Sequence, residues 1–325
     1  MHTTTVPNLS SLLKVLGAAG VTDLVVNGPA DWRVNRGAGF QPIDGLLGAQ
    51  QQPASALAEL ARQFVDLADR HLDLANPVCD VSLTPGHLPE LAAAGIESLR
   101  VHAVLESAIS AQTLLSIRVH RAGFHSLERL GEQGMFTAAQ GAKLAQLMAE
   151  QQNFLIAGPA GAGKTTLLRA LLAQDPERRT VVVEDTAELL PMPGHVVGLQ
   201  ARQANIDGRG AITLDALAQQ ALRMQPQRLV IGEVRGSEVM VLLQSMNTGH
   251  AGSAATIHAN SPQTVYPRLR GLAQSSGVSD SAFQLLAQSA IQKVIFLGGP
   301  QGDLGGVGLE KKVQRTVQWI GSLQW

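Results

Sequence analysis

The chain has 325 residues, 45% of them hydrophobic, and a formal net charge of −1 at pH 7. This length is enough for two domains that each bury a core, while the near-neutral charge and 3% aromatic content argue against a general nucleic-acid-binding surface. The lone Cys79 fits a reducing compartment, and no apolar run approaches the ~18–20 residues of a membrane helix. We therefore expect a cytoplasmic protein without a membrane span of its own.

The first 120 residues contain short, mixed patterns. Apolar residues at helical spacing predict helices over 8–18 and 54–74. Extended patterns predict strands or hairpins over 21–29, 32–37, 101–105 and 114–118. These patterns predict a small α+β domain over residues 1–120, followed by a linker over residues 121–130.

From residue 131 onward, short apolar strands alternate with helical patterns. The predicted strands are 154–157, 180–183, 228–231, 254–257, 294–297 and 313–320. The predicted helices include 137–151, 213–224 and 237–246. This alternation predicts an α/β domain over residues 131–325, with a mostly parallel sheet covered on both faces. Such a sheet binds its ligand beyond the carboxyl ends of the strands, where polar residues collect here.

A glycine-rich turn lies between a predicted strand and a predicted helix. It reads Gly158-Pro159-Ala160-Gly161-Ala162-Gly163-Lys164-Thr165-Thr166, and its first eight residues match G-x-x-x-x-G-K-[ST]. Glycines allow several backbone N–H groups to converge on phosphate oxygens. Lys164 supplies charge for the β- and γ-phosphates, and the Thr165 hydroxyl is placed to hold Mg²⁺. The turn therefore predicts a site for ATP and Mg²⁺.

Acidic residues follow two of the other predicted strands. Glu233 follows the strand 228–231, at the position of the acid that orients Mg²⁺ in phosphate-loop NTPases. Glu184, Asp185 and Glu188 cluster after the preceding strand of the predicted sheet. Such a cluster either favours a helix N-terminus or supplies a base that activates water. We take Glu184 as the candidate base, with Glu188 as its rival.

Two histidines, His250 and His258, flank the predicted strand 254–257 in glycine-rich surroundings. A metal centre is not expected there, because no cysteine accompanies them and their spacing is not that of a helical ligand pair. We expect both histidines to contact the γ-phosphate and the acids.

Four stretches, in order, resemble the Walker A, Asp, Walker B and His boxes of the type II/type IV secretion ATPases: residues 158–165, 183–188, 228–235 and 247–260. Segments 221–224 and 21–29 are most similar to the Tad/Flp-pilus assembly ATPases of the CpaF type. The resemblance implies a RecA-like P-loop ATPase domain preceded by a smaller α+β N-terminal domain. It also implies that Arg100 and Arg118 match the N-terminal-domain arginines that reach the nucleotide in this family.

The same resemblance implies a Mg²⁺-dependent ATPase motor. Its working form would be a homohexamer with ATP between the two domains, driving Tad/Flp-type pilus assembly or type II/IV-like secretion through an inner-membrane platform protein. Gln219, Gln225 and Gln227 stand where the family often carries charges, which leaves a nucleotide-gated scaffold without hydrolysis as an alternative. A nucleic-acid translocase on the same core is the other alternative.

Overall fold

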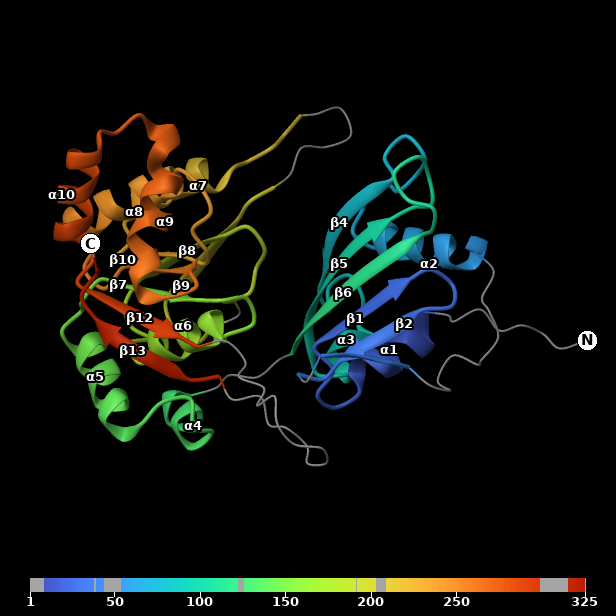
Figure 1. Cartoon of the computed structure of the whole chain (residues 1–325), viewed down its shortest axis with the longest axis horizontal. Coiled ribbons are helices and arrows are strands. Elements are labelled where there is room, and N and C mark those ends of the chain that lie inside the picture. Colours follow the sequence, from blue (N-terminus) through green and yellow to red (C-terminus); the bar gives the residue numbers. More distant parts are fainter. Residues whose placement is uncertain are drawn as a thin grey trace, which may run out of the picture. The chain divides into compact units, whose positions relative to one another are not determined.

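The computed structural model describes residues 9–37, 39–43, 54–121, 126–190, 192–202, 209–298 and 315–324. These residues form two compact units, the first within 9–121 and the second within 126–324 (Figure 1). Each unit has its own sheet and its own hydrophobic core, so we describe them one at a time.

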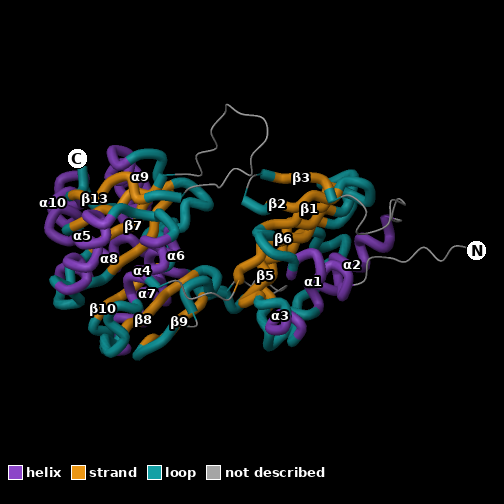
Figure 2. The backbone as a smooth tube through the Cα atoms, turned by 90° about the horizontal axis from the view of Figure 1, so that it is seen from below, coloured by secondary structure: helices purple, strands orange, loops and turns teal. Residues whose placement is uncertain are grey.

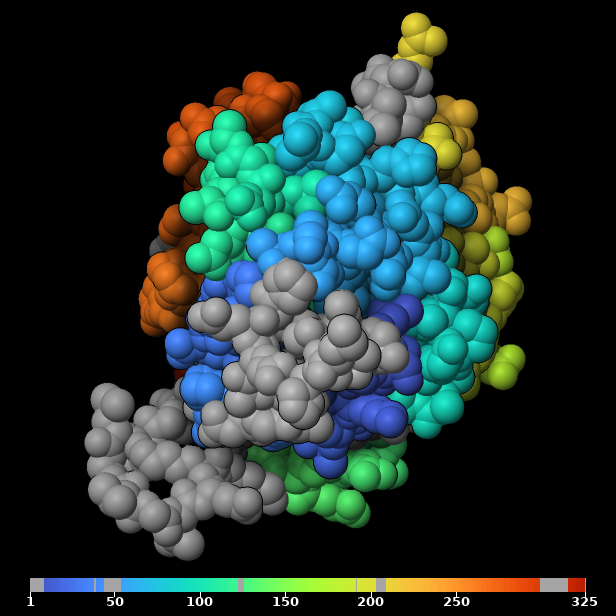
Figure 3. Space-filling view, turned by 90° about the vertical axis from the view of Figure 1, so that its right-hand side faces the viewer, coloured from blue at the N-terminus to red at the C-terminus, as the bar shows by residue number. Residues whose placement is uncertain are grey.

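The described part of the first unit is a six-stranded antiparallel sheet with helices on one side (Figure 2). Its strand order is β3-β2-β1-β6-β5-β4. The strands are β1 (Asp23–Asn27), β2 (Trp32–Asn35), β3 (Phe40–Pro42), β4 (Val78–Leu83), β5 (Ile96–Val104) and β6 (Leu114–Arg121). The helices are α1 (Leu9–Gly17), α2 (Ala54–Asp66) and α3 (Glu90–Ala93). Figure 3 views this unit from the side that α1 and α2 cover.

The sheet of this unit has one apolar and one polar face. Along β6, Leu115 and Ile117 are buried against the helices, while the residues between them are exposed. Arg118 on β6 and Arg100 on β5 therefore lie on the face turned away from the core, as the period of two in a strand requires.

The first unit differs from the sequence-based expectation in several places, among them β3 and α3, which were not predicted. The helix expected over 54–74 ends at Asp66, because Asp69 adopts a left-handed backbone (φ 53°) that stops it, and Leu74 is 74% exposed. Strand β4 was not predicted, although its alternating burial places Val81 and Leu83 in the core.

The described part of the second unit is a seven-stranded sheet of order β13-β12-β7-β11-β10-β8-β9. All neighbours are parallel except β13, which is antiparallel to β12. The strands are β7 (Phe154–Gly158), β8 (Thr180–Glu184), β9 (Val196–Gln200), β10 (Arg228–Ile231), β11 (Ala254–His258), β12 (Lys293–Leu297) and β13 (Val317–Gly321). The mostly parallel sheet agrees with the alternation of strands and helices in the sequence.

Helices cover both faces of this sheet (Figure 1). One face packs against α4 (Leu127–Glu132), α5 (Ala138–Ala149) and α6 (Lys164–Leu172). The other packs against α8 (Glu238–Asn247), α9 (Val265–Ala273) and α10 (Asp280–Ala290), while α7 (Leu214–Ala221) packs beside α8 and β8. Successive residues of β7 point to opposite faces, Ile156 to the first and Ala157 to the second, which is why the strand is apolar throughout.

Several elements of this unit depart from the sequence-based expectation. Strand β9 was missed because it is a half-exposed edge strand without an apolar run, and α9 and α10 were also not predicted. Helix α4 begins inside the stretch expected to be a linker, where Ser126 caps it and its apolar residues join the core. The Gly-rich stretch 298–308, between the predicted strands 294–297 and 313–320, lies almost entirely outside the described residues.

Candidate functional site

The glycine-rich turn connects β7 to α6 with a backbone that favours glycine. Gly161 (φ 72°) and Gly163 (φ 90°) are left-handed, and a Cβ on Gly158 would lie 2.5 Å from the carbonyl oxygen of Leu297. Gly163 is the N-cap of α6 and provides no side chain to satisfy the first amides of that helix. Uncapped amides at a helix N-terminus are suited to bind an anion, so the turn fits a phosphate group.

Lys164, the first residue of α6, is buried in this turn at 7% exposure. Its Nζ donates to the carbonyl oxygens of Gly158 and Pro159, both at 3.0 Å, and lies 3.2 Å from Nδ1 of His258. Burial lowers the pKa of Lys164 to about 8. The ammonium group has three N–H donors, and all three have an acceptor inside the protein.

His258 links the turn to the acid of the next strand. It ends β11, directly opposite Gly158 of β7. Its Nε2 lies 3.2 Å from Oε1 of Glu233, so a neutral ring that accepts from Lys164 donates from Nε2 to Glu233. Burial and the neighbouring charge of Lys164 keep the pKa of His258 below its ordinary value despite the carboxylate.

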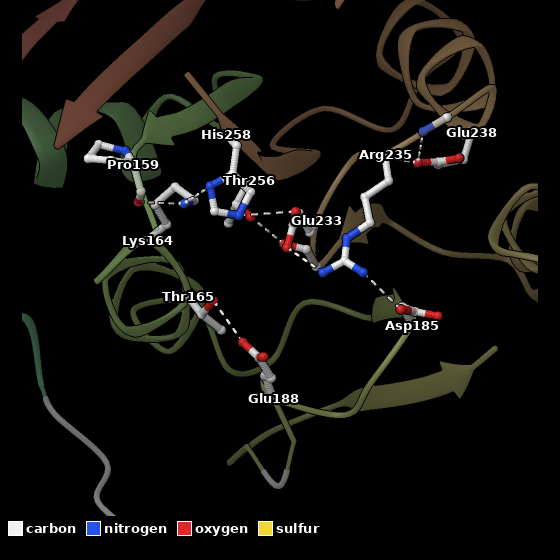
Figure 4. A network of polar contacts seen from close by, with 12 residues as sticks. Pro159, Lys164, Thr165, Asp185, Glu188, Glu233, Arg235, Glu238, Thr256 and His258 are labelled. Carbon is white, nitrogen blue, oxygen red and sulfur yellow. Dashed lines mark hydrogen bonds and ion pairs between the residues drawn. The ribbon is translucent and has the colours of Figure 1, made fainter. Parts of the chain in front are cut away.

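Glu233 follows β10 and is held from a second side by Arg235. Its Oε2 accepts from the Arg235 guanidinium at 2.9 Å, and the same guanidinium donates to Oδ2 of Asp185 at 3.0 Å. Burial alone would raise the pKa of Glu233, but Arg235, His258 and Lys164 together outweigh it and lower that pKa. Figure 4 shows the resulting network, which runs from Lys164 to Asp185 across the ends of β7, β11, β10 and β8.

The two candidate bases occupy different environments. Glu184 is 4% exposed, and its Oε1 accepts the backbone N–H groups of Glu188 and Leu189, both at 3.0 Å. Its side chain fills the space over Gly232, where a Cβ would lie 2.8 Å from Glu184 Cγ. Glu188, by contrast, accepts a hydrogen bond from the Thr165 hydroxyl at 3.1 Å (Figure 4). The geometry therefore places Glu188 at the phosphate loop, whereas Glu184 binds the backbone of the segment that follows β8. This arrangement favours Glu188 over Glu184, our first choice, as the base.

The structure separates the two histidines. His250 precedes β11 at the amino end of that strand, and its Nδ1 lies 3.2 Å from the carbonyl oxygen of Ser245. His258 lies at the opposite end of the same strand. Within the described chain, only His258 takes part in the network with Lys164 and Glu233.

The first unit places Arg100 and Arg118 directly opposite each other on β5 and β6. Arg118 donates to Asp23 on β1 at 3.0 Å, whereas no hydrogen bond or ion pair of Arg100 occurs within the described residues. Like charges that face each other across strands destabilise a sheet, and Asp23 offsets this for Arg118 but not for Arg100.

The residues of the second unit fit a nucleotide with Mg²⁺. Among the described residues, no three His, Cys, Asp or Glu side chains could together hold a metal ion. Mg²⁺ bound to a nucleotide takes few protein ligands, because phosphate oxygens and water supply the others. The Thr165 hydroxyl and the Glu233 carboxylate are oxygen donors of the kind it prefers.

The sequence analysis did not identify Arg235 as part of the site, although its place two residues after Glu233 was a usable signal.

Residues 97–296 match the family model described as "Type II/IV secretion system protein". A putative conjugal transfer protein of Mycobacterium tuberculosis is 40% identical over 284 residues, covering 86% of this chain and 77% of its own. VirB11 of Agrobacterium fabrum is 34% identical over 177 residues, covering 52% and 51%. The ATPase DotB of Legionella pneumophila has a similar structure (TM-score 0.64, 17% identity, covering 97% and 80%), which confirms the expected fold class.

No helix in the described part of the chain combines the length and the apolar character needed to cross a membrane.

The buried Glu184 predicts a pH-dependent stability of the second unit. Burial raises its pKa from 4.5 to about 7, so the folded protein binds this proton more tightly than the unfolded chain does. The stabilisation is complete below pH ~4.5 and is lost as the pH rises through about 7. Relative to Glu184→Gln, which keeps an acceptor for both amides, the wild type should lose about 2–3 kcal/mol of unfolding free energy between pH 5 and 8.

Chemical denaturation at the two pH values measures this difference. Asp280→Asn, at a side chain that is 72% exposed, serves as the control and should follow the wild type. An identical pH dependence in the wild type and in Glu184→Gln would contradict the prediction.

Proposed function

This chain belongs to the type II/IV secretion system protein family and is a P-loop ATPase, and we propose that it is a Mg²⁺-dependent motor for pilus assembly or secretion. The polar network at the strand ends supports this most directly. It joins the phosphate-loop Lys164 to Glu233 through His258, so a charge change at the phosphate loop reaches the neighbouring strands.

We propose that each site residue acts on the nucleotide by position and charge. The backbone N–H groups of the loop 158–166, apart from Pro159, which has none, and the ammonium of Lys164 bind the phosphates. Thr165 with Glu233 holds Mg²⁺, which neutralises phosphate charge when bound. Glu188 takes the role of orienting the attacking water, since it is the acid in contact with Thr165. Glu184 positions Glu188 through its backbone amide, and His258 holds Glu233.

We propose that the first unit supplies the arginines. In this organisation an N-terminal domain (residues 1–120) moves against the ATPase domain (131–325) about a linker (121–130), and Arg100 and Arg118 bind the transferring phosphate when the domains close. Arg100 has no partner within the described residues and shares a polar face with Arg118, and both observations support this role. Arginines that stabilise the transferring group are a recurring element of phosphoryl transfer.

We propose that the working form is a homohexamer that docks on a membrane platform protein at the inner face of the cytoplasmic membrane. The Tad/Flp-pilus branch is our choice within the family, from the similarity of segments 221–224 and 21–29. Gln219 and Gln227 have partners within the chain, Asp215 and the backbone N–H of Arg179. Their contacts support ring interfaces that do not depend on the charges missing at these positions.

Two alternatives predict different behaviour. A nucleotide-gated scaffold would bind ATP without steady release of phosphate, and a nucleic-acid translocase would bind DNA in a salt-sensitive way. The complete set of phosphate-loop and acidic residues favours hydrolysis over the scaffold, and the near-neutral charge favours a protein partner over a nucleic acid.

Substitution of the acids separates their roles. We expect Glu188→Gln and Glu233→Gln to bind nucleotide and lose about 10²–10³-fold in turnover, because each removes charge next to the reacting phosphate. Glu184→Gln keeps both amide contacts and should stay within about tenfold of the wild type. Phosphate release under saturating Mg-ATP measures all three. Normal turnover in Glu188→Gln together with a large loss in Glu184→Gln would restore Glu184 as the base.

Removal of the arginines tests the role of the first unit. Arg100→Ala and Arg118→Ala should each lower turnover by about 10³-fold or more, with nucleotide affinity changed far less. Arg33→Ala is the matched control, since Arg33 is an exposed arginine of the same sheet that pairs with Asp31. If both variants hydrolyse ATP as fast as the control does, the proposed role is wrong.

Assembly provides the test of the motor itself. We expect hexamers in the presence of Mg²⁺ and a non-hydrolysable ATP analogue, smaller species without nucleotide, and a specific activity that rises with protein concentration. Light scattering coupled to size exclusion measures the mass. Lys164→Ala is the control and should neither hydrolyse ATP nor assemble with the analogue, because it lacks the phosphate-loop charge. A wild-type monomer under both conditions, with activity independent of concentration, would contradict a ring.

A further inference from the structure

We propose that Arg235 is a positioning residue for ATP hydrolysis, which holds the carboxylate of Glu233 in place by tying it to Asp185. This inference rests on the proposed role of Glu233 in holding Mg²⁺. Arg235 touches neither phosphate nor metal in this scheme. Its effect reaches the reaction only through the orientation of Glu233.

The guanidinium of Arg235 lies between carboxylates from two neighbouring strands. One terminal nitrogen donates to Oδ2 of Asp185 at 3.0 Å and the other donates to Oε2 of Glu233 at 2.9 Å (Figure 4). The two strands, β8 and β10, are paired directly, with Ile231 opposite Val183. A guanidinium is planar with fixed donor directions, so it sets the spacing of the two acids.

The backbone that carries Arg235 is itself held firmly. The amides of Arg235 and Gly236 both donate to Oε1 of Glu238, which is 4% exposed at the start of α8. The amide of Val234 donates to the carbonyl oxygen of Thr256 on β11. Arg235 therefore acts from a fixed segment, and a change in its side chain is not absorbed by movement of the loop.

Both oxygens of Glu233 have a defined partner, since His258 binds Oε1 and Arg235 binds Oε2. If Arg235 is removed, Oε2 of Glu233 loses its partner, while the neutral ring of His258 still contacts Oε1. Asp185 loses the positive charge of the same guanidinium. Asp185 and Glu233 then repel each other at adjacent strand ends, so Glu233 is held in its present direction less firmly, through its remaining contact with His258. Arg235 is 44% exposed, but it differs from an isolated surface ion pair because it joins the acids of two neighbouring strand ends.

Three variants test this role in the full-length chain. Arg235→Gln should lower kcat by about 10–100-fold and raise the Mg²⁺ concentration needed for half-maximal turnover, as is typical when a residue that orients a metal ligand is lost. Arg235→Lys should recover part of the loss, because one donor remains for Glu233. Asp185→Asn should act in the same direction as Arg235→Gln, and the double variant should be no worse than the single Arg235 variant.

The binding of a fluorescent ATP analogue in the presence of EDTA provides a readout that does not depend on hydrolysis. Its affinity should stay within about threefold of the wild type, because the phosphate loop is unchanged. Arg270→Gln is the control, an arginine of similar exposure that pairs with Asp280 and should leave kcat and the Mg²⁺ requirement unchanged.

Wild-type kcat and Mg²⁺ requirement in both Arg235→Gln and Asp185→Asn would overturn the inference. Weaker binding of the analogue together with a lower melting temperature, neither of them restored by Arg235→Lys, would also overturn it, because that result indicates a structural role. Glu233→Gln separates the two proposals. If that variant keeps full turnover, the proposed function of Glu233 fails; if it is inactive while the Arg235 variants are normal, only this inference fails.

Discussion

Four neighbouring strands of the second unit run parallel, and their carboxyl ends therefore meet at one edge of the sheet. Gly158 at the end of β7 lies opposite His258 at the end of β11, and Glu233 and Asp185 follow the next two strands. Residues separated by up to 100 positions in the chain are thus placed within hydrogen-bonding distance by backbone pairing alone. The network then depends only on the side-chain conformations, because the strand register fixes the backbone position of each residue.

In the second unit, the three side chains proposed to bind phosphate or metal already have partners within the chain. Lys164 is bound by carbonyl oxygens and by His258, Thr165 by Glu188, and Glu233 by Arg235. Burying a charge without a partner is costly, so these contacts allow the site to stay folded without a ligand. Binding of a nucleotide then becomes an exchange of partners. In the proposed function, such an exchange at Lys164 would release His258 and so carry occupancy of the phosphate loop to Glu233.

The sequence predicted those parts of the fold that depend on local composition. The apolar strands β7, β8, β10 and β11 and the phosphate loop were correctly predicted because each is complete within a few residues. Edge strand β9 was missed, since it lacks the buried, continuous apolar pattern of the central strands. The same distinction between local features and features that depend on the fold applies to the site. Glu184 and Glu188 are four positions apart in the chain, and only the fold decides which of them turns into the core. His250 and His258 flank one strand, yet the length of that strand holds them apart.

The first unit imposes a further constraint on any mechanism that uses its arginines. Its core lies on one face of the sheet, so the opposite face can carry charge without loss of packing. Arg100 and Arg118 stand side by side there, and Asp23 neutralises only Arg118. Asp23 binds Arg118 from β1, on the side of β6 opposite β5, so Arg100 is the arginine of this pair without a partner within the described residues. In the proposed function, a phosphate group would supply that partner for Arg100, and the sheet can hold the charge because its core lies on the other face.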